Sequence, residues 1–174
     1  MKIMRQIFGV AGLLVSNAAF ADYWCPPGPE EEVRARGECV DASPRDVKNH
    51  REKWYAASRK EAQQLPVDYQ DLIFRFLTNK APTRKDAFCL VVFDDQPPAP
   101  LIRRLRAAGR NVRQCNASKP DFRYVERIRQ IGPDKFLMNY QSFCGSLCAG
   151  EWEITITRNA DDSFSIDEKL LWIS

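Results

Sequence analysis

Hydrophobic and polar residues follow two different periods along this chain, and the change of period separates a helical part from a strand-rich part. From residue 43 to residue 78, apolar residues recur every three or four positions, which is typical of amphipathic helices. Ser43 can cap a helix, Pro44 fits its first turn and Pro66 interrupts it. We therefore predict helices over 43–65 and 67–78. The second has an apolar face formed by Tyr69, Leu72, Ile73, Phe76 and Leu77.

The middle of the chain contains shorter elements. The run AFCLVVF at 87–93 is apolar, β-branched and bounded by charged residues, so it predicts a buried strand. Residues 100–109 read as a short helix that ends at Gly109. The segment NVRQC, 111–115, predicts a brief strand.

From Phe122 onward, apolar and polar residues alternate with a period of two, as they do in half-buried strands. The pattern predicts four successive strands, at about 122–131, 135–144, 151–157 and 163–174. Successive strands with short connections favour an antiparallel meander. We expect an α+β fold in which the helices pack on one face of this mainly antiparallel sheet.

The first 21 residues resemble a secretory signal. Cations in MKIMRQ precede a short apolar run, and Ala19-Phe20-Ala21 is a small-x-small cleavage site. Cleavage after Ala21 predicts a periplasmic or secreted protein, and no other segment is long and apolar enough to cross a membrane. Residues 22–42 form an acidic, turn-rich segment that carries cysteines, and 43–174 form a single α+β domain.

Six cysteines follow the predicted cleavage site, and an even number in an oxidising compartment predicts disulfides. Six cysteines allow 15 pairings. Sequential pairing is favoured because each pair is then local. It joins Cys25 to Cys39, Cys89 to Cys115 and Cys144 to Cys148.

Cys144 and Cys148 could instead form a redox-active pair or bind a metal ion. A thioredoxin-type motif has two residues between its cysteines and a helix after the first, whereas here three residues lie between two strands. A zinc site needs four ligands. We therefore predict a structural bridge at this pair, and no metal or cofactor for the protein.

The string FCGSLCAGEWEITI, followed by a turn and by LLWIS, resembles the C-terminal end of uncharacterised secreted bacterial proteins. Those proteins carry a C-G-x-L-C segment between two strands and close with W-[IV]-S. The resemblance covers about the last fifty residues. It implies a C-terminal meander and no activity.

Charge is unevenly distributed. Removing the two cations of the signal lowers the formal net charge from +3 to +1, so nucleic acid is a poor candidate partner.

Residues 101–130 are strongly basic, between acidic segments at 22–42 and 151–168. We predict that the arginines of the basic segment form a patch for an acidic protein or an anionic envelope polymer, unless the protein's own acids pair with them. The candidate patch residues are Arg103, Arg104, Arg106, Arg123, Arg127 and Arg129.

Candidate catalytic groups are few, and none is assigned. His50 is the only histidine, in a charged helix. Asp94 and Asp95 follow a strand, and adjacent side chains on extended chain point in opposite directions, so turn residues are the simpler reading. Asp161 and Asp162 are also predicted in a turn. The sequence contains no phosphate-binding glycine loop, nucleophile elbow or His-Glu-x-x-His motif.

Three hypotheses for function remain open. The first is an exported, non-enzymatic binding or accessory protein of the inhibitor, immunity or envelope-associated type, which uses a charged sheet or helix surface. The second is a secreted metal-dependent hydrolase or thiol redox enzyme. The third is a small-ligand binder with a pocket lined by Trp54, Tyr69 and Trp152.

Overall fold

A computed structural model of the chain describes residues 22–26, 30–79, 87–113, 115, 121–144 and 149–173. The predicted signal segment lies outside these residues. The described part contains four helices and eight strands, the last five of which follow one another without a helix between them. The helices are α1 (Glu30–Ala35), α2 (Pro44–Gln63), α3 (Tyr69–Asn79) and α4 (Ala99–Ala107). The strands are β1 (Asp22–Trp24), β2 (Val40–Ala42), β3 (Phe88–Val92), β4 (Val112–Arg113), β5 (Asp121–Gly132), β6 (Lys135–Cys144), β7 (Ala149–Arg158) and β8 (Phe164–Ile173).

The predicted start of α2 is confirmed. Ser43 is the N-cap, and its Oγ accepts a hydrogen bond from the Asp46 backbone N–H at 3.3 Å. Pro44 occupies the first turn, where its missing N–H costs nothing. The four C-terminal strands also lie where the alternating pattern places them.

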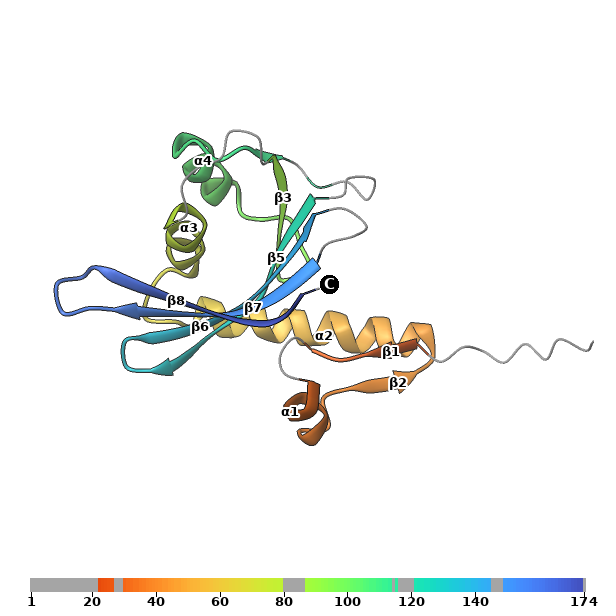
Figure 1. Cartoon of the computed structure of the whole chain (residues 1–174). Helices are drawn as coiled ribbons and strands as arrows, with labels where there is room; N and C mark the ends of the chain where they lie inside the picture. The colour runs from red at the N-terminus through yellow and green to blue at the C-terminus, as the bar shows by residue number, and fades with distance from the viewer. Residues whose placement is uncertain are drawn as a thin grey trace, which may run out of the picture.

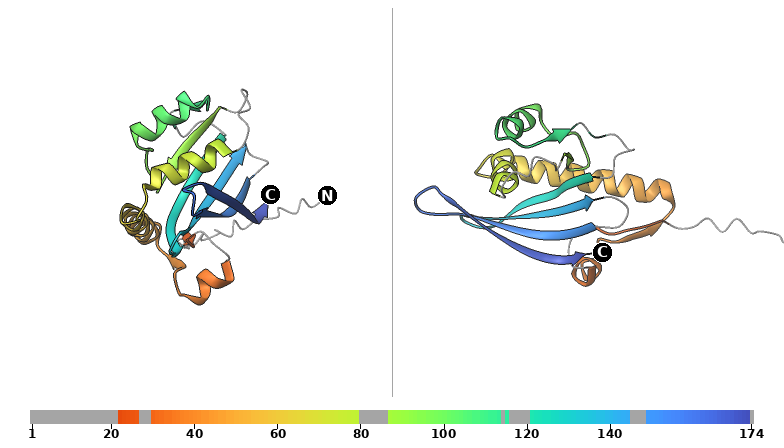
Figure 2. Two further views of the ribbon diagram at one scale, coloured as in Figure 1. Left: turned by 90° about the vertical axis from the view of Figure 1, so that its left-hand side faces the viewer. Right: turned by 45° about the horizontal axis from the view of Figure 1, so that its top comes forward.

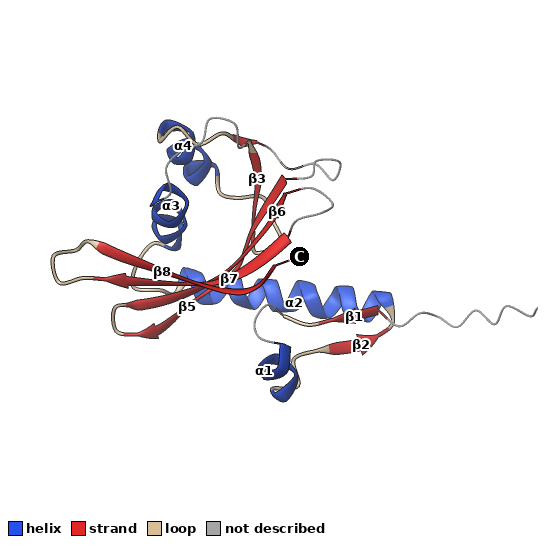
Figure 3. Ribbon diagram, viewed as in Figure 1, coloured by secondary structure: helices blue, strands red, loops and turns tan. Residues whose placement is uncertain are grey.

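The predicted four-stranded antiparallel meander is wrong, because the sheet is mixed and has six strands in the order β4-β3-β5-β6-β7-β8 (Figure 3). β5 to β8 are antiparallel neighbours, whereas β3 pairs in parallel with both β4 and β5. Parallel neighbours need a crossover connection, and α4 provides it between β3 and β4. The protein is therefore α+β with a mixed sheet.

The described helices pack on both faces of the sheet, which corrects the prediction of one covered face. Arg127 is paired with Asn139 in the β5–β6 ladder and bonds Glu61 of α2. Tyr140, the next residue of β6, points to the opposite face and packs edge-on against Phe76 of α3 at 4.9 Å between ring centroids. Figure 1 shows α3 and α4 together, away from the long α2.

The main core lies between the sheet and α3 and α4. Its central side chains from the sheet are fully buried, and they come from strands that are far apart in sequence. They include Leu90, Ile128, Phe136, Met138, Ile154 and Ile156. Leu72 and Ile73 of α3, both fully buried, confirm the apolar face predicted for that helix. Gly150 allows the Trp152 ring to lie over it, because a Cβ there would come within 2.5 Å of the ring.

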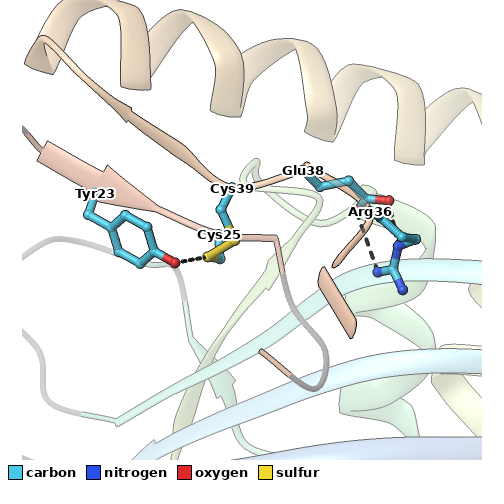
Figure 4. The surroundings of a disulfide bond; sticks show 5 residues. All are labelled: Tyr23, Cys25, Arg36, Glu38 and Cys39. Atoms are coloured by element: carbon cyan, nitrogen blue, oxygen red, sulfur yellow. Dashed lines mark hydrogen bonds and ion pairs between the residues drawn. A yellow bond between two sulfur atoms is a disulfide. The ribbon is translucent and has the colours of Figure 1, made fainter. Parts of the chain in front are cut away.

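The N-terminal segment is fastened to α2. β1 and β2 form a two-stranded antiparallel ribbon, and the predicted Cys25–Cys39 disulfide joins the two ends of the intervening segment (Figure 4). Arg36 and Glu38 form an ion pair beside it at 2.7 Å. Trp24 of β1 contacts the rings of His50 and Trp54, at 5.6 and 5.9 Å between centroids. These contacts hold the ribbon along the N-terminal half of α2 (Figure 1).

Candidate functional site

The end of β3 carries strained backbone. Phe93 and Asp94 have φ of 53° and 57°, in the left-handed region that bulky side chains avoid. They form the two central residues of a tight turn, closed by reciprocal backbone hydrogen bonds between Val92 and Asp95 at 3.0 and 3.1 Å. Such two-residue turns usually contain Asn-Gly or Asp-Gly, so Phe-Asp needs support from the rest of the structure.

Two arginines of α2 provide that support. Arg51 bonds the Asp94 carboxylate at 2.6 Å, and Arg59 bonds the Asp95 carboxylate at 3.0 Å. Arg59 also donates to the Phe93 carbonyl at 3.3 Å. The prediction that Asp94 and Asp95 are turn residues is confirmed. Each carboxylate has its own cationic partner.

An open hollow of about 280 Å³ lies beside this turn, on the α2 side of β3 and β5. It is lined by Val91, Asp94, Asp95, Gln96, Cys115, Phe122 and Tyr124. Cys115 belongs to the predicted disulfide with Cys89, which is present. Burial, followed by the nearby Asp94 carboxylate, raises the pKa of the Tyr124 hydroxyl. The hollow therefore combines the aromatic rings of Phe122 and Tyr124 with the polar side chains of Asp94, Asp95 and Gln96.

Glu126 lies on β5, two residues after Tyr124, and is 6% exposed. Its Oε1 accepts a hydrogen bond from the Tyr55 hydroxyl at 3.1 Å, whereas its Oε2 is buried without a hydrogen-bond partner. Burial, and then repulsion by Glu151, raises the pKa of Glu126 to about 8. A carboxyl group in such a site is protonated over much of the neutral range.

The predicted patch arginines are not brought together on one face. A β-bulge between Val125 and Arg127 reverses the alternation of β5. Arg123 therefore points to the α3 side, where it bonds the Tyr140 hydroxyl at 3.1 Å, whereas Arg127 and Arg129 point to the opposite side. Arg123, Arg127 and Arg129 therefore do not form a patch on one face of the sheet.

Most patch arginines have partners within the chain. Arg127 bonds Glu61 at 2.9 Å, Arg106 donates to the Val112 carbonyl at 3.0 Å, and Arg104 bonds an aspartate of α3. Asp71 and Glu61, the ion-pair partners of Arg104 and Arg127, belong to α3 and α2 and not to the acidic segment at 151–168. An anionic partner for the exposed Arg103, Arg106 and Arg129 stays a prediction.

Asp71 is the aspartate that joins α3 to α4. Its two carboxylate oxygens accept from Arg75 at 2.5 Å and from Arg104 at 2.6 Å. Burial by itself would raise the pKa of Asp71, but the hydrogen bonds from Arg104 and Arg75 outweigh it and hold the pKa below its usual value. The guanidinium groups also stack on Phe164 and Phe74. This cluster fastens the helices to β8.

The aromatic residues proposed to line one pocket are separated. Trp54 belongs to α2 and packs against Trp24 and Arg127. Trp152 stacks on Tyr140 on the opposite face of the sheet. Tyr69 contacts Phe93. The predicted pocket formed by Trp54, Tyr69 and Trp152 is therefore wrong.

Asp161 and Asp162 lie in the turn between β7 and β8, as predicted. The pairing of Cys144 with Cys148 lies outside the described residues, because 145–148 are not among them. The resemblance of the C-terminal segment, which includes these cysteines, to uncharacterised secreted bacterial proteins stays a prediction.

β8 forms one edge of the sheet, and within the described residues it pairs only with β7 (Figure 2). The opposite edge, β4, has two residues, whereas β8 has ten. Three large apolar side chains near its end are exposed: Leu170 by 49%, Trp172 by 41% and Ile173 by 71%. The alternating sequence pattern predicts that Leu170, Trp172 and Ile173 lie on a strand. It does not show that no other part of the described protein packs over them.

No group of three or more metal-ligating side chains lies close enough to hold an ion in the described part of the chain. None of the described helices is long and apolar enough to cross a membrane. The two disulfides agree with an oxidising compartment. No protein-family model, curated protein or solved structure matches the chain.

Proposed function

We propose that this is an exported, non-enzymatic binding protein that engages a protein partner by adding a strand of the partner to the β8 edge. The observation that carries the proposal is the exposed apolar end of a long edge strand. Edge strands present unpaired N–H and C=O groups, and an extended peptide can pair with them. Alternate side chains of the peptide would then be recognised by the sheet surface.

Protein edges are usually protected by charge, proline or short length. The middle of β8 has such protection in Asp167, Glu168 and Lys169, and Lys169 bonds Glu153 of β7 at 3.3 Å. The end of the strand, from Leu170 onward, contains no charged residue among 170–173. The Trp172 indole N–H is held by Glu151 at 2.8 Å, so this ring is fixed in its exposed position.

The exposed area is large enough to matter for affinity. Fully burying a Leu, Ile or Phe side chain contributes about 1.5–3 kcal/mol. Leu170 and Trp172 are roughly half buried already, whereas Ile173 is 71% exposed. Covering what remains would contribute on the order of 1 kcal/mol for each side chain, in addition to the ladder hydrogen bonds.

A different protein is favoured over a second copy of this chain. Antiparallel self-pairing registers that use nearly the whole of β8 are centred on Glu168 or Lys169. Each places two like charges directly opposite each other at its centre, which is destabilising, and only the register centred on Glu168 offsets this, through two Asp167–Lys169 pairs. The proposed partner therefore supplies an extended segment whose apolar residues meet 170–173.

The test is capture from an envelope extract, followed by binding of the purified captured protein. Leu170→Asp and Ile173→Asp should each weaken binding at least about tenfold, because an unpaired carboxylate would enter the interface. Ile131→Asp is the matched control, since Ile131 is 46% exposed on the separate β5–β6 hairpin.

Hydrogen exchange gives an independent readout. The backbone amides of 165–173 should exchange more slowly in the complex than in the free protein. Equal binding by the three aspartate variants, or unchanged exchange in β8, would contradict the proposal. A dimer that Ile173→Asp dissociates would instead identify a second copy as the occupant.

A further inference from the structure

The hollow beside the Phe93–Asp94 turn has an aromatic wall. Phe122 and Tyr124 follow each other on one face of β5, with ring centroids 5.9 Å apart. Phe143 of β6 packs edge-on against Tyr124 at 5.8 Å. Val91 of β3 lies in register with Tyr124 and completes the apolar surface. These rings are only partly buried, so a ligand can contact them.

The charges around the hollow cancel. Arg51 neutralises Asp94, and Arg59 neutralises Asp95, each through a direct ion pair. A charged ligand would gain little net Coulomb attraction from this balanced rim and would lose its hydration. The site therefore favours a ligand without net charge.

The rim nevertheless offers many hydrogen-bonding groups. Each carboxylate has about four acceptor positions, and the arginines use only part of them. Asp95 Oδ1 also accepts from the Gln96 backbone N–H at 2.7 Å. The side-chain amide of Gln96 and the Tyr124 hydroxyl add both donors and acceptors. A neutral ligand that is rich in hydroxyl groups matches this set.

We propose that this hollow is a binding site for a neutral saccharide. One face of a pyranose ring carries C–H groups and packs on an aromatic ring, while its hydroxyls reach the polar rim. The hollow, of about 280 Å³, is close to the lower end of the usual range for ligand pockets, about 300–1,000 Å³, which matches a small ligand of one or two sugar rings. The proposal is independent of partner binding at β8, because the hollow involves β3 and β5 and lies at a different part of the sheet.

The experiment is a ¹H–¹⁵N NMR titration of the mature protein with maltose, cellobiose and N,N′-diacetylchitobiose at millimolar concentrations. At least one disaccharide should produce saturable shifts that centre on 91–96 and 122–124. Tyr124→Ala should weaken that binding about tenfold, whereas Tyr124→Phe, which keeps the ring, should weaken it about threefold or less.

Gln96→Ala is a second variant at an exposed position, and it should weaken binding several-fold without altering the fold. Trp172→Ala is the matched control, since this exposed aromatic residue lies on β8. The proposal is overturned if none of the three sugars gives saturable shifts, or if Tyr124→Ala and Gln96→Ala bind as the unchanged protein does. Shifts confined to β8 would also overturn it.

Discussion

Replacing Glu126 with glutamine should change how the stability of the protein depends on pH. The pKa of Glu126 is about 8 in the folded protein, against an ordinary value of 4.5. Because folding raises this pKa, the stabilising preference for the protonated form is fully present below about pH 4.5. It declines as the pH rises and is lost above about pH 8. Glutamine does not titrate, so Glu126→Gln removes this contribution.

The magnitude follows from the difference between the two pKa values. Each unit corresponds to 1.36 kcal/mol, so complete ionisation costs roughly 5 kcal/mol. Between about pH 5 and about pH 9, the unchanged protein should lose roughly 4 kcal/mol relative to Glu126→Gln. The unpartnered Oε2 position adds a cost of about 1–3 kcal/mol in either protein, and this cost does not depend on pH in the variant.

The assay is urea unfolding at several pH values, with free energies obtained by linear extrapolation. The informative quantity is the difference between the two proteins, because other titrating groups cancel in it. Glu61→Gln is the control, since it removes a partly exposed carboxylate at the same helix–strand interface and should cost at most about 1 kcal/mol. A difference between Glu126→Gln and the unchanged protein that stays constant from about pH 5 to about pH 9 would refute the reasoning.

Three further predictions concern packing and cross-links. Gly150→Ala should destabilise the protein by about 1–3 kcal/mol in urea unfolding, because the new Cβ would lie 2.5 Å from the Trp152 ring; an unchanged midpoint would contradict the contact. Replacing Cys89 and Cys115 together by serine should cost about 3.5 kcal/mol, from the chain entropy of a 26-residue loop, and a loss below about 1 kcal/mol would contradict it. Asp71→Asn removes the acceptor shared by two arginines and should lower the thermal midpoint; because folding lowers this pKa, the unchanged protein should lose the same contribution as the pH falls below 3.8, and equal acid sensitivity in both proteins would refute the assignment.

Much of the local structure could be predicted from the sequence. Ser43 caps α2, the apolar stripe of α3 faces the core, and the alternating strands form where the period changes. Two sequential disulfides are also present as predicted. These features depend on residues that are near one another in the chain, so their patterns carry the information.

The candidate sites were predicted poorly, because they depend on contacts between distant segments. Asp94 and Asp95 could be placed in a turn, but their partners on α2 lie 43 and 36 residues away. Glu126 carries no signal of burial in its own strand. A single bulge beside it reverses the alternation and sends Arg123 to a different face from Arg127.

By itself, the sequence determined where α2 to α4 and β3 to β8 lie, which residues can be apolar together and which compartment suits the cysteines; it gave no sign of β1, α1 and β2 in the turn-rich segment at 22–42. Only the tertiary structure decided that β3 joins the sheet in parallel, that α2 covers the face opposite α3, and that β8 is left at an edge with its apolar end exposed. The physical reason is that local periodicity fixes the faces of each element, whereas the order of strands depends on which surfaces bury one another across the whole chain.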